Sequence, residues 1–202
     1  MTQYFVDNRE ISAPFDASSL DQVLKYVERL HFKSTDAVIR QVRVDGQSIV
    51  PETPESVMQS GDWEKVEIFT GTMGEVAHES IGGAMEYLGK LEELIPALSL
   101  KFQDIPESYD FGDLRNLCEG FFFINMLLEK LFTGYQISLD QTVVQGFSVR
   151  EHLRKFIGVL NQLNESQEQG NYLMIADTLE YEILPFISVW KDVFEKISGK
   201  VN

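Results

Sequence analysis

The sequence predicts an α+β protein in two parts, a small mixed module in residues 1–72 and an antiparallel four-helix bundle in residues 73–202. Two observations lead to this prediction. In the first part, short runs that alternate apolar and polar residues lie on both sides of one amphipathic segment, as in a sheet with a single helix. In the second part, four long segments repeat apolar residues at alternating spacings of three and four, which is typical of helices around a shared core.

Turn and cap residues set the limits of the elements in the first part. Asp45-Gly46 lies between two apolar runs, which is the strongest short-range signal for a β-hairpin. Asp7-Asn8 is a second turn-forming pair, and Ser18-Ser19 offers a helix N-cap. The expected elements are two strands within residues 3–11, a helix from Ser18 to about Phe32, strands over 37–44 and 47–50, a loop at Pro51, Pro54 and Gly61, and a strand over 65–69.

This order of strand, strand, helix, strand, strand, loop and strand resembles the β-grasp, or ubiquitin-like, fold over about residues 2–70. The resemblance implies a module that presents a sheet face or edge to a partner. Ubiquitin-like carriers end in a free Gly-Gly, whereas here the last strand runs into Gly71–Gly74 and 128 further residues. We therefore expect no carrier chemistry. With the helical part added, the layout is similar to uncharacterised bacterial two-domain proteins.

Each of the four helical segments has one apolar seam that we expect to face the core. Ser148 and Glu151 form a capping box that fixes the start of the third helix. The short link 166–171 makes its neighbouring helices antiparallel, and we expect the longer loop 133–147 to hold a turn of helix over one end of the bundle. The expected core positions are Ala77, Ile81, Ala84, Leu88, Leu91, Ile95, Leu98 and Phe102; Leu114, Leu117, Phe121, Ile124, Leu128 and Leu131; Val149, Leu153, Phe156, Leu160 and Leu163; and Tyr172, Ile175, Leu179, Ile183, Phe186, Trp190, Val193 and Ile197.

The second helix has more apolar residues than its seam requires. Phe122, Phe123, Met126 and Leu127 extend the apolar surface, which predicts a helix buried on more than one side and a partner-binding face at these four residues. A large side chain left exposed there would forgo about 1.5–3 kcal/mol of burial. We expect the N-terminal module, a second copy of the chain or another protein to cover this face.

Two prolines, Pro96 and Pro185, lie inside the first and fourth helical segments. Each lacks a backbone N–H and frees the carbonyl four residues earlier. A kink at either proline opens a pocket between helices or only bends the helix around its core, and we expect the second outcome.

The sequence contains one Glu-x-x-His pair, Glu75 and His78. Ferritin-like di-metal bundles use two such pairs, and His152 cannot complete a second one because it directly follows Glu151. Glu75 and His78 also lie off the apolar seam, so we expect an ordinary surface pair. We assign no metal ligand and no cofactor.

Other polar residues of the helices give weak indications of chemistry. Glu180 and Glu182 flank the fourth seam and are expected to be solvated, although a carboxylate turned inward would act as an acid or base. Asn125 is expected to be a buried polar group that needs a hydrogen-bond partner. Cys118 has no neighbouring Cys or His, and no nucleotide-binding or hydrolase motif occurs, so we assign no catalytic residue.

Charge and hydropathy exclude several classes of partner. The net charge of −15 disfavours nucleic acid and anionic membrane surfaces. No stretch reaches the roughly 18–20 apolar residues of a membrane span. The first residues lack the basic and apolar segments of a signal peptide, and Cys118 is the only cysteine, so we expect a cytoplasmic protein.

These observations predict a non-enzymatic adaptor or chaperone-like protein that binds another protein through the apolar face of the second helix. Two alternatives stay open. One is a small-ligand binder or an enzyme with its site at the interface of the two parts or at the Pro185 kink. The other is a structural homodimer that uses the same face between its two copies.

Overall fold

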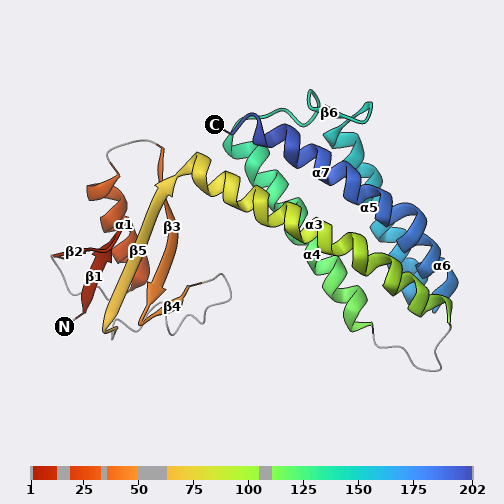
Figure 1. The fold of residues 1–202 in the computed structure, drawn as a ribbon, viewed down its shortest axis with the longest axis horizontal. Coiled ribbons are helices and arrows are strands. Elements are labelled where there is room, and N and C mark those ends of the chain that lie inside the picture. Colours follow the sequence, from red (N-terminus) through yellow and green to blue (C-terminus); the bar gives the residue numbers. More distant parts are fainter. Residues whose placement is uncertain (1, 13–18, 33–35, 50–62, 105–110, 202) are drawn as a thin grey trace. The chain divides into compact units, whose positions relative to one another are not determined.

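The computed structural model describes residues 2–12, 19–32, 36–49, 63–104 and 111–201 (Figure 1). The chain divides into two compact units, Met1–Val76 and Ala77–Asn202, which we call the sheet unit and the helical unit. The predicted α+β class is confirmed, with a mixed sheet in the first unit and packed helices in the second. Within the described residues, no helix is both long enough and apolar enough to cross a membrane.

The sheet unit consists of one five-stranded sheet and a helix that packs on it (Figure 1). The strand order is β2-β1-β5-β3-β4; β1 and β5 are parallel, and the other neighbours are antiparallel. The last strand of the unit therefore lies between the first and the third. The elements are β1 (Gln3–Val6), β2 (Arg9–Ile11), α1 (Leu20–His31), β3 (Ala37–Val44), β4 (Gln47–Ser48) and β5 (Lys65–Thr72).

Both predicted hairpins are confirmed, and their turn residues have the expected backbone conformation. Asp7 and Asn8 have φ of 48° and 64°, and Asp45 and Gly46 have φ of 50° and 81°. Positive φ at both central residues matches the right-handed twist of the flanking strands. The Asp7 carboxylate also accepts hydrogen bonds from the backbone N–H and the hydroxyl of Thr70, at 2.8 and 2.6 Å, which ties this turn to β5.

The other predicted limits in the sheet unit differ by a few residues. Ser19 is the N-cap of α1, and its hydroxyl accepts the N–H of Gln22 at 3.4 Å. β4 ends at Ser48, earlier than expected, and β5 continues to Thr72. Because the third and fifth strands pair over their whole length, β5 extends as far as β3 offers partners. The predicted loop at Pro51, Pro54 and Gly61 lies outside the described residues.

The helical unit has one hydrophobic core to which all of its helices contribute. The predicted seams of the first and second helices are confirmed completely, since every expected position is buried. In the fourth, every expected position is buried except Tyr172, which is half-buried. The helices are α3 (Met73–Gln103), which begins in the sheet unit, α4 (Gly112–Gly134), α5 (Val149–Glu168), α6 (Tyr172–Asp177), the π-helix η1 (Thr178–Ile183) and α7 (Leu184–Ser198).

The third seam is rotated from the predicted one. Leu153 and Leu160 are only half-buried, while His152 and Val159 are buried in their place. Positions 149, 152, 156, 159 and 163 also alternate spacings of three and four, so periodicity alone does not choose between the two faces. The aromatic rings of α7 select this face, because Phe156 packs against Phe186 and Trp190 with ring centroids 5.0 and 5.6 Å apart.

The segment between α4 and α5 contains a single turn in which the N–H of Thr142 bonds to the carbonyl of Ser138, four residues earlier, at 3.0 Å. After this turn comes a short hairpin, which was not predicted, of β6 (Val143–Val144) and β7 (Phe147–Ser148). Gln145 and Gly146 form its turn with φ of 49° and 86°, a conformation that no α-helix contains. Ile137 and Leu139 nevertheless pack on the core, so the segment covers apolar surface as expected.

Candidate functional site

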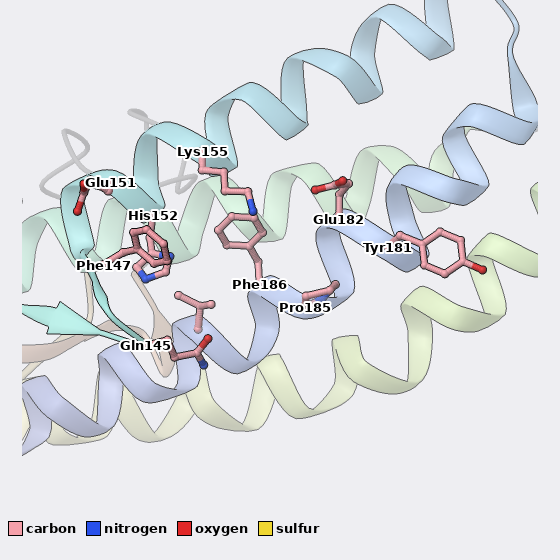
Figure 2. A pocket seen from close by; sticks show the side chains of 10 residues that line it. Gln145, Phe147, Glu151, His152, Lys155, Tyr181, Glu182, Pro185 and Phe186 are labelled. Carbon is pink, nitrogen blue, oxygen red and sulfur yellow. The ribbon is translucent and has the colours of Figure 1, made fainter.

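A pocket of about 280 Å³ lies where the β6–β7 hairpin and α5 meet the π-helix and the start of α7 (Figure 2). Apolar surface predominates in its lining, and five ionisable side chains lie among the apolar ones. The lining residues are Gln145, Phe147, Glu151, His152, Lys155, Tyr181, Glu182, Pro185, Phe186 and Val189. Pockets of this kind, apolar with a few polar groups, are the usual form of small-molecule sites.

The π-helix shapes one wall of this pocket. At its end, the N–H of Leu184 bonds to the carbonyl of Leu179, five residues earlier. Pro185, which has no backbone N–H, follows in the first turn of α7, directly after the π-helix. A bend of the fourth helix was expected at Pro185, with a pocket between helices as the alternative; the structure has a π-helical turn before Pro185 and a pocket beside it. Single π-helical turns within α-helices often occur at functional sites.

His152 is the most buried ionisable side chain of the pocket, with 7% of its surface exposed. Its Nε2 lies 2.9 Å from the carbonyl oxygen of Val144. Because a carbonyl only accepts hydrogen bonds, Nε2 carries the proton in this contact. In this tautomer Nδ1 is an acceptor, and it has no hydrogen-bond partner among the described residues. The rings of Phe147 and Phe186 meet the imidazole edge to face, at 5.8 and 6.4 Å.

The hairpin that supplies Phe147 is fixed to α7 by polar contacts. Gln145 Nε2 donates to Asp192 Oδ2 at 2.7 Å and to Ser188 Oγ at 3.2 Å. Lys196 Nζ donates to the carbonyl of Val143 at 2.7 Å. These bonds hold the hairpin against α7 and leave the Gln145 amide oxygen as a second acceptor in the pocket lining.

The charged side chains of the pocket do not neutralise one another. The Lys155 ammonium lies 5.7 Å from the centre of the Phe186 ring, in a cation–π contact. No ion pair between Lys155 and Glu151 or Glu182 exists among the described residues. The hydroxyl and the N–H of Ser148 bond to the Glu151 carboxylate at 2.7 and 2.8 Å and hold its pKa below the ordinary value. This is the predicted capping box of α5, which is confirmed.

The predicted partner-binding residues do not all lie on one surface. Phe122 and Phe123 are 71% and 53% exposed, and Met126 is also exposed. Leu127 is half-buried and packs against the core of the helical unit. The described surface therefore has an exposed apolar patch of Phe122, Phe123 and Met126, which we call the α4 patch. That another molecule covers it stays a prediction.

The polar residues singled out in the sequence have structural contacts. Glu75 forms a capping box with Thr72: its carboxylate accepts the Thr72 N–H at 2.8 Å, and its own N–H donates to the Thr72 hydroxyl at 3.1 Å. The half-buried Glu180 carboxylate accepts from Ser99 Oγ and Gln103 Nε2, at 3.3 and 3.4 Å, so it is less solvated than expected. The described residues contain no group of three or more His, Cys, Asp or Glu side chains placed to hold a metal.

Two further residues of α4, Asn125 and Cys118, were singled out in the sequence. Asn125 is half-buried; its Nδ2 donates to the Phe121 carbonyl at 2.9 Å, while its enclosed Oδ1 has no partner among the described residues. Burial, and then the adjacent Glu119 carboxylate, raise the pKa of the Cys118 thiol, which keeps it protonated. A protonated thiol is a poor nucleophile.

Sequence reasoning missed most of the pocket. Roles were predicted for Pro185, Glu182, Glu151 and Phe186, but none for Lys155 or Phe147, and His152 was considered only as a metal ligand. One signal was present: His152 fits a seam through Val149 and Phe156 as well as Leu153 does, and a histidine in an apolar seam needs a hydrogen-bond partner. The hairpin that brings Val144 and Phe147 to it has too few residues to show a periodic pattern.

A family model for a domain of unknown function (DUF8042) matches residues 79–193, more than half of the chain. The chain belongs to this family. The DUF8042 region begins within α3 and ends within α7, so it includes every residue of the pocket and of the α4 patch. No curated protein and no solved structure matches the chain.

Proposed function

We propose that this DUF8042 protein is a non-enzymatic interaction module, adaptor or chaperone-like, that binds another protein through the α4 patch. The main support is the exposure of Phe122 and Phe123, 71% and 53%, on a helix whose opposite side is fully buried. Aromatic residues and methionine are enriched where proteins meet, and two adjacent exposed rings are costly to leave in water.

The surroundings of the α4 patch favour a different protein over a second copy. Arg115 and Lys130 lie one or two turns from Phe122 and Phe123, as do Glu119 and Glu129, so local charge is balanced. The whole chain, however, has a net charge of −15, and two copies repel each other. A partner with an apolar surface and a lower negative charge avoids this repulsion.

The proposal is tested with a variant in which Phe122 and Phe123 are both replaced by Ser. Affinity capture from the native host should lose its specific partner, while the thermal denaturation curve stays nearly unchanged because both rings are exposed. Leu100→Ser is the matched control, since Leu100 is an exposed apolar residue on α3, outside the α4 patch. Equal capture by the double variant and the wild type would refute the proposal.

Light scattering at several protein concentrations distinguishes the homodimer alternative from binding of a different protein. The proposal predicts a monomer whose mass does not depend on concentration. A wild-type dimer that the Phe122→Ser, Phe123→Ser variant dissociates would instead establish the α4 patch as a contact between two copies.

The architecture of both units is part of the proposal. We infer a β-grasp, ubiquitin-like module for the sheet unit; its support is the chain order of the elements and the position of β5 between β1 and β3. We infer an antiparallel four-helix bundle for the helical unit; its support is the common core and the tight turn at Gln169–Asn171. We also infer a cytoplasmic location, which the lone Cys118 supports.

A second candidate function is small-molecule binding at the pocket beside Pro185. Its support is the pocket itself, which combines a volume of about 280 Å³ with a buried histidine whose Nδ1 has no partner among the described residues. Both functions can coexist, because the residues of the pocket and those of the α4 patch are different.

A further inference from the structure

We propose that the pocket beside Pro185 binds a small arylalkylamine, an aromatic ring that carries a positively charged alkylammonium side chain. This inference rests on the second candidate function, ligand binding at the pocket, and adds the chemical class of the ligand. It follows from the size of the pocket, its free hydrogen-bond acceptors and its charge.

The size and walls of the pocket fit a flat ring system. An apolar cavity of about 150 Å³ holds benzene, so about 280 Å³ has room for a fused ring with a short side chain. Phe147, Pro185 and Phe186 supply flat apolar surface for such a ring. Phe147 is largely exposed, so ligand binding would bury a ring that now faces water.

The unused hydrogen-bonding capacity of two lining residues, His152 and Gln145, is for acceptance. His152 is more than nine-tenths buried, and its Nε2–H is taken by the Val144 carbonyl. Its Nδ1 therefore accepts a hydrogen bond from a donor in the pocket. The Gln145 amide has its nitrogen engaged by Ser188 and Asp192 and likewise offers only oxygen. A ligand that satisfies these groups has to bring N–H or O–H donors.

The charge of the pocket favours a cation. Glu151 and Glu182 contribute two carboxylates against the single ammonium of Lys155, and the chain as a whole is strongly acidic. Glu182 is half-buried and makes no hydrogen bond or ion pair with any described residue. The face of Phe186 already attracts the Lys155 ammonium, at 5.7 Å, which shows that an organic cation fits against this wall.

These groups line the same pocket. In the view of Figure 2, Phe186 lies between His152 and Glu182, with Lys155 over its ring. A fused ring placed along Phe186 would donate its ring N–H to His152 Nδ1 and direct its ammonium group to Glu182. Lys155 is exposed, and its long side chain can turn to solvent when a second cation arrives.

The test uses three probes with the same ring and different charge: tryptamine, the neutral alcohol tryptophol, and indole-3-propionate. Isothermal titration calorimetry with the full chain should give the tightest binding for tryptamine and at least tenfold weaker binding for indole-3-propionate. Binding of the carboxylate or the alcohol as tightly as the amine would overturn the assigned ligand class and leave ligand binding at the pocket standing. Absence of binding by all three would refute both.

Two matched glutamate variants locate the charge that matters. Glu182→Gln should weaken tryptamine binding about tenfold or more, because it removes the carboxylate that would receive the ammonium. Glu180→Gln is the control: Glu180 lies in the same π-helix, but its carboxylate contacts Ser99 and Gln103 and does not line the pocket. Equal losses in both variants, or none in Glu182→Gln, would contradict the proposal.

Lys155→Ala provides a result of opposite sign. Removal of this ammonium takes away the competing cation over Phe186, so tryptamine should bind more tightly and indole-3-propionate more weakly. Unchanged or weaker binding of tryptamine by Lys155→Ala than by the wild type would contradict the proposal.

Discussion

Three consecutive phenylalanines of α4 allow a direct test of which side of this helix is core. Phe121 is fully buried and meets Phe156 in a T-shaped contact at 4.9 Å, whereas Phe122 is 71% exposed. We expect Phe121→Ala to destabilise the helical unit strongly and Phe122→Ala to have almost no effect. The two changes delete the same atoms one residue apart, so the comparison depends only on the environment of each ring.

The magnitudes follow from burial. Replacement of a buried Phe by Ala lowers the free energy of unfolding by about 3–5 kcal/mol. This cost includes the lost transfer of the ring from water to the core and the cavity that the ring leaves behind. For Phe122, about three tenths of a burial gain of about 1.5–3 kcal/mol is at stake, or roughly 0.5–0.9 kcal/mol. Alanine is a better helix former than phenylalanine by about 0.5 kcal/mol, which offsets most of that loss.

Thermal and guanidinium denaturation, followed by far-UV circular dichroism, measure the difference. At about 2–4 °C per kcal/mol, Phe121→Ala should lower the Tm by roughly 6–20 °C and Phe122→Ala by less than about 2 °C. Similar losses for the two variants would refute the reasoning, because they would mean that Phe122 is covered in solution. A loss for Phe122→Ala that grows with protein concentration would identify a second copy as the cover.

Two further contacts of the helical unit give predictions that depend on context. A Cβ at Gly120 would lie 1.7 Å from Tyr87 Oη, so Gly120→Ala should lower the Tm of the wild type. In a Tyr87→Ala background the same change should raise the free energy of unfolding by about 1 kcal/mol, because alanine is the better helix former. Thermal denaturation measures both effects, and a loss of stability in both backgrounds would exclude Tyr87 as the cause. The Ser148 hydrogen bonds depress the pKa of Glu151 below its ordinary 4.5, so they add stability above that pH that is lost as pH falls through the depressed value. Glu151→Gln keeps the capping box without a titrating group. The free energy of unfolding of this variant, measured by urea denaturation, should be lower than that of the wild type at neutral pH, and the difference should shrink as pH falls below 4.5. A difference that does not depend on pH would contradict this.

The elements that the sequence predicted well are those whose signal repeats. The seams of α3 and α4 contain eight and six expected positions, and a misplaced register would have put several of them in water. The two hairpins of the sheet unit were predictable for a different reason: Asp7-Asn8 and Asp45-Gly46 are residue pairs that tolerate positive φ at both positions. In both cases the information is local to the segment.

The pocket was not predictable, because its parts depend on contacts between distant segments. The β6–β7 hairpin has two residues in each strand and is held by α7 through Gln145 and Lys196. Rotation of α5 toward His152 depends on the rings of α7, and the α7 sequence does not show which face of α5 they meet. Pro185 marked the place, but a kink, a bend and a π-helix have the same proline signature.

The family match bears on where a common function resides. It spans residues 79–193 and therefore leaves out the whole sheet unit, while the pocket residues from Gln145 to Val189 and the α4 patch lie inside it. A property that DUF8042 domains share has to be sought in helices α3 to α7, whichever of the two proposed sites provides it.

The two sites also differ in the structure that forms them. The α4 patch needs only an exposed helix, whereas one wall of the pocket is a π-helix, a type of helix that contains well under one residue in a hundred. The pocket is thus the feature less easily explained by packing alone, and the three indole probes are the experiment to perform first.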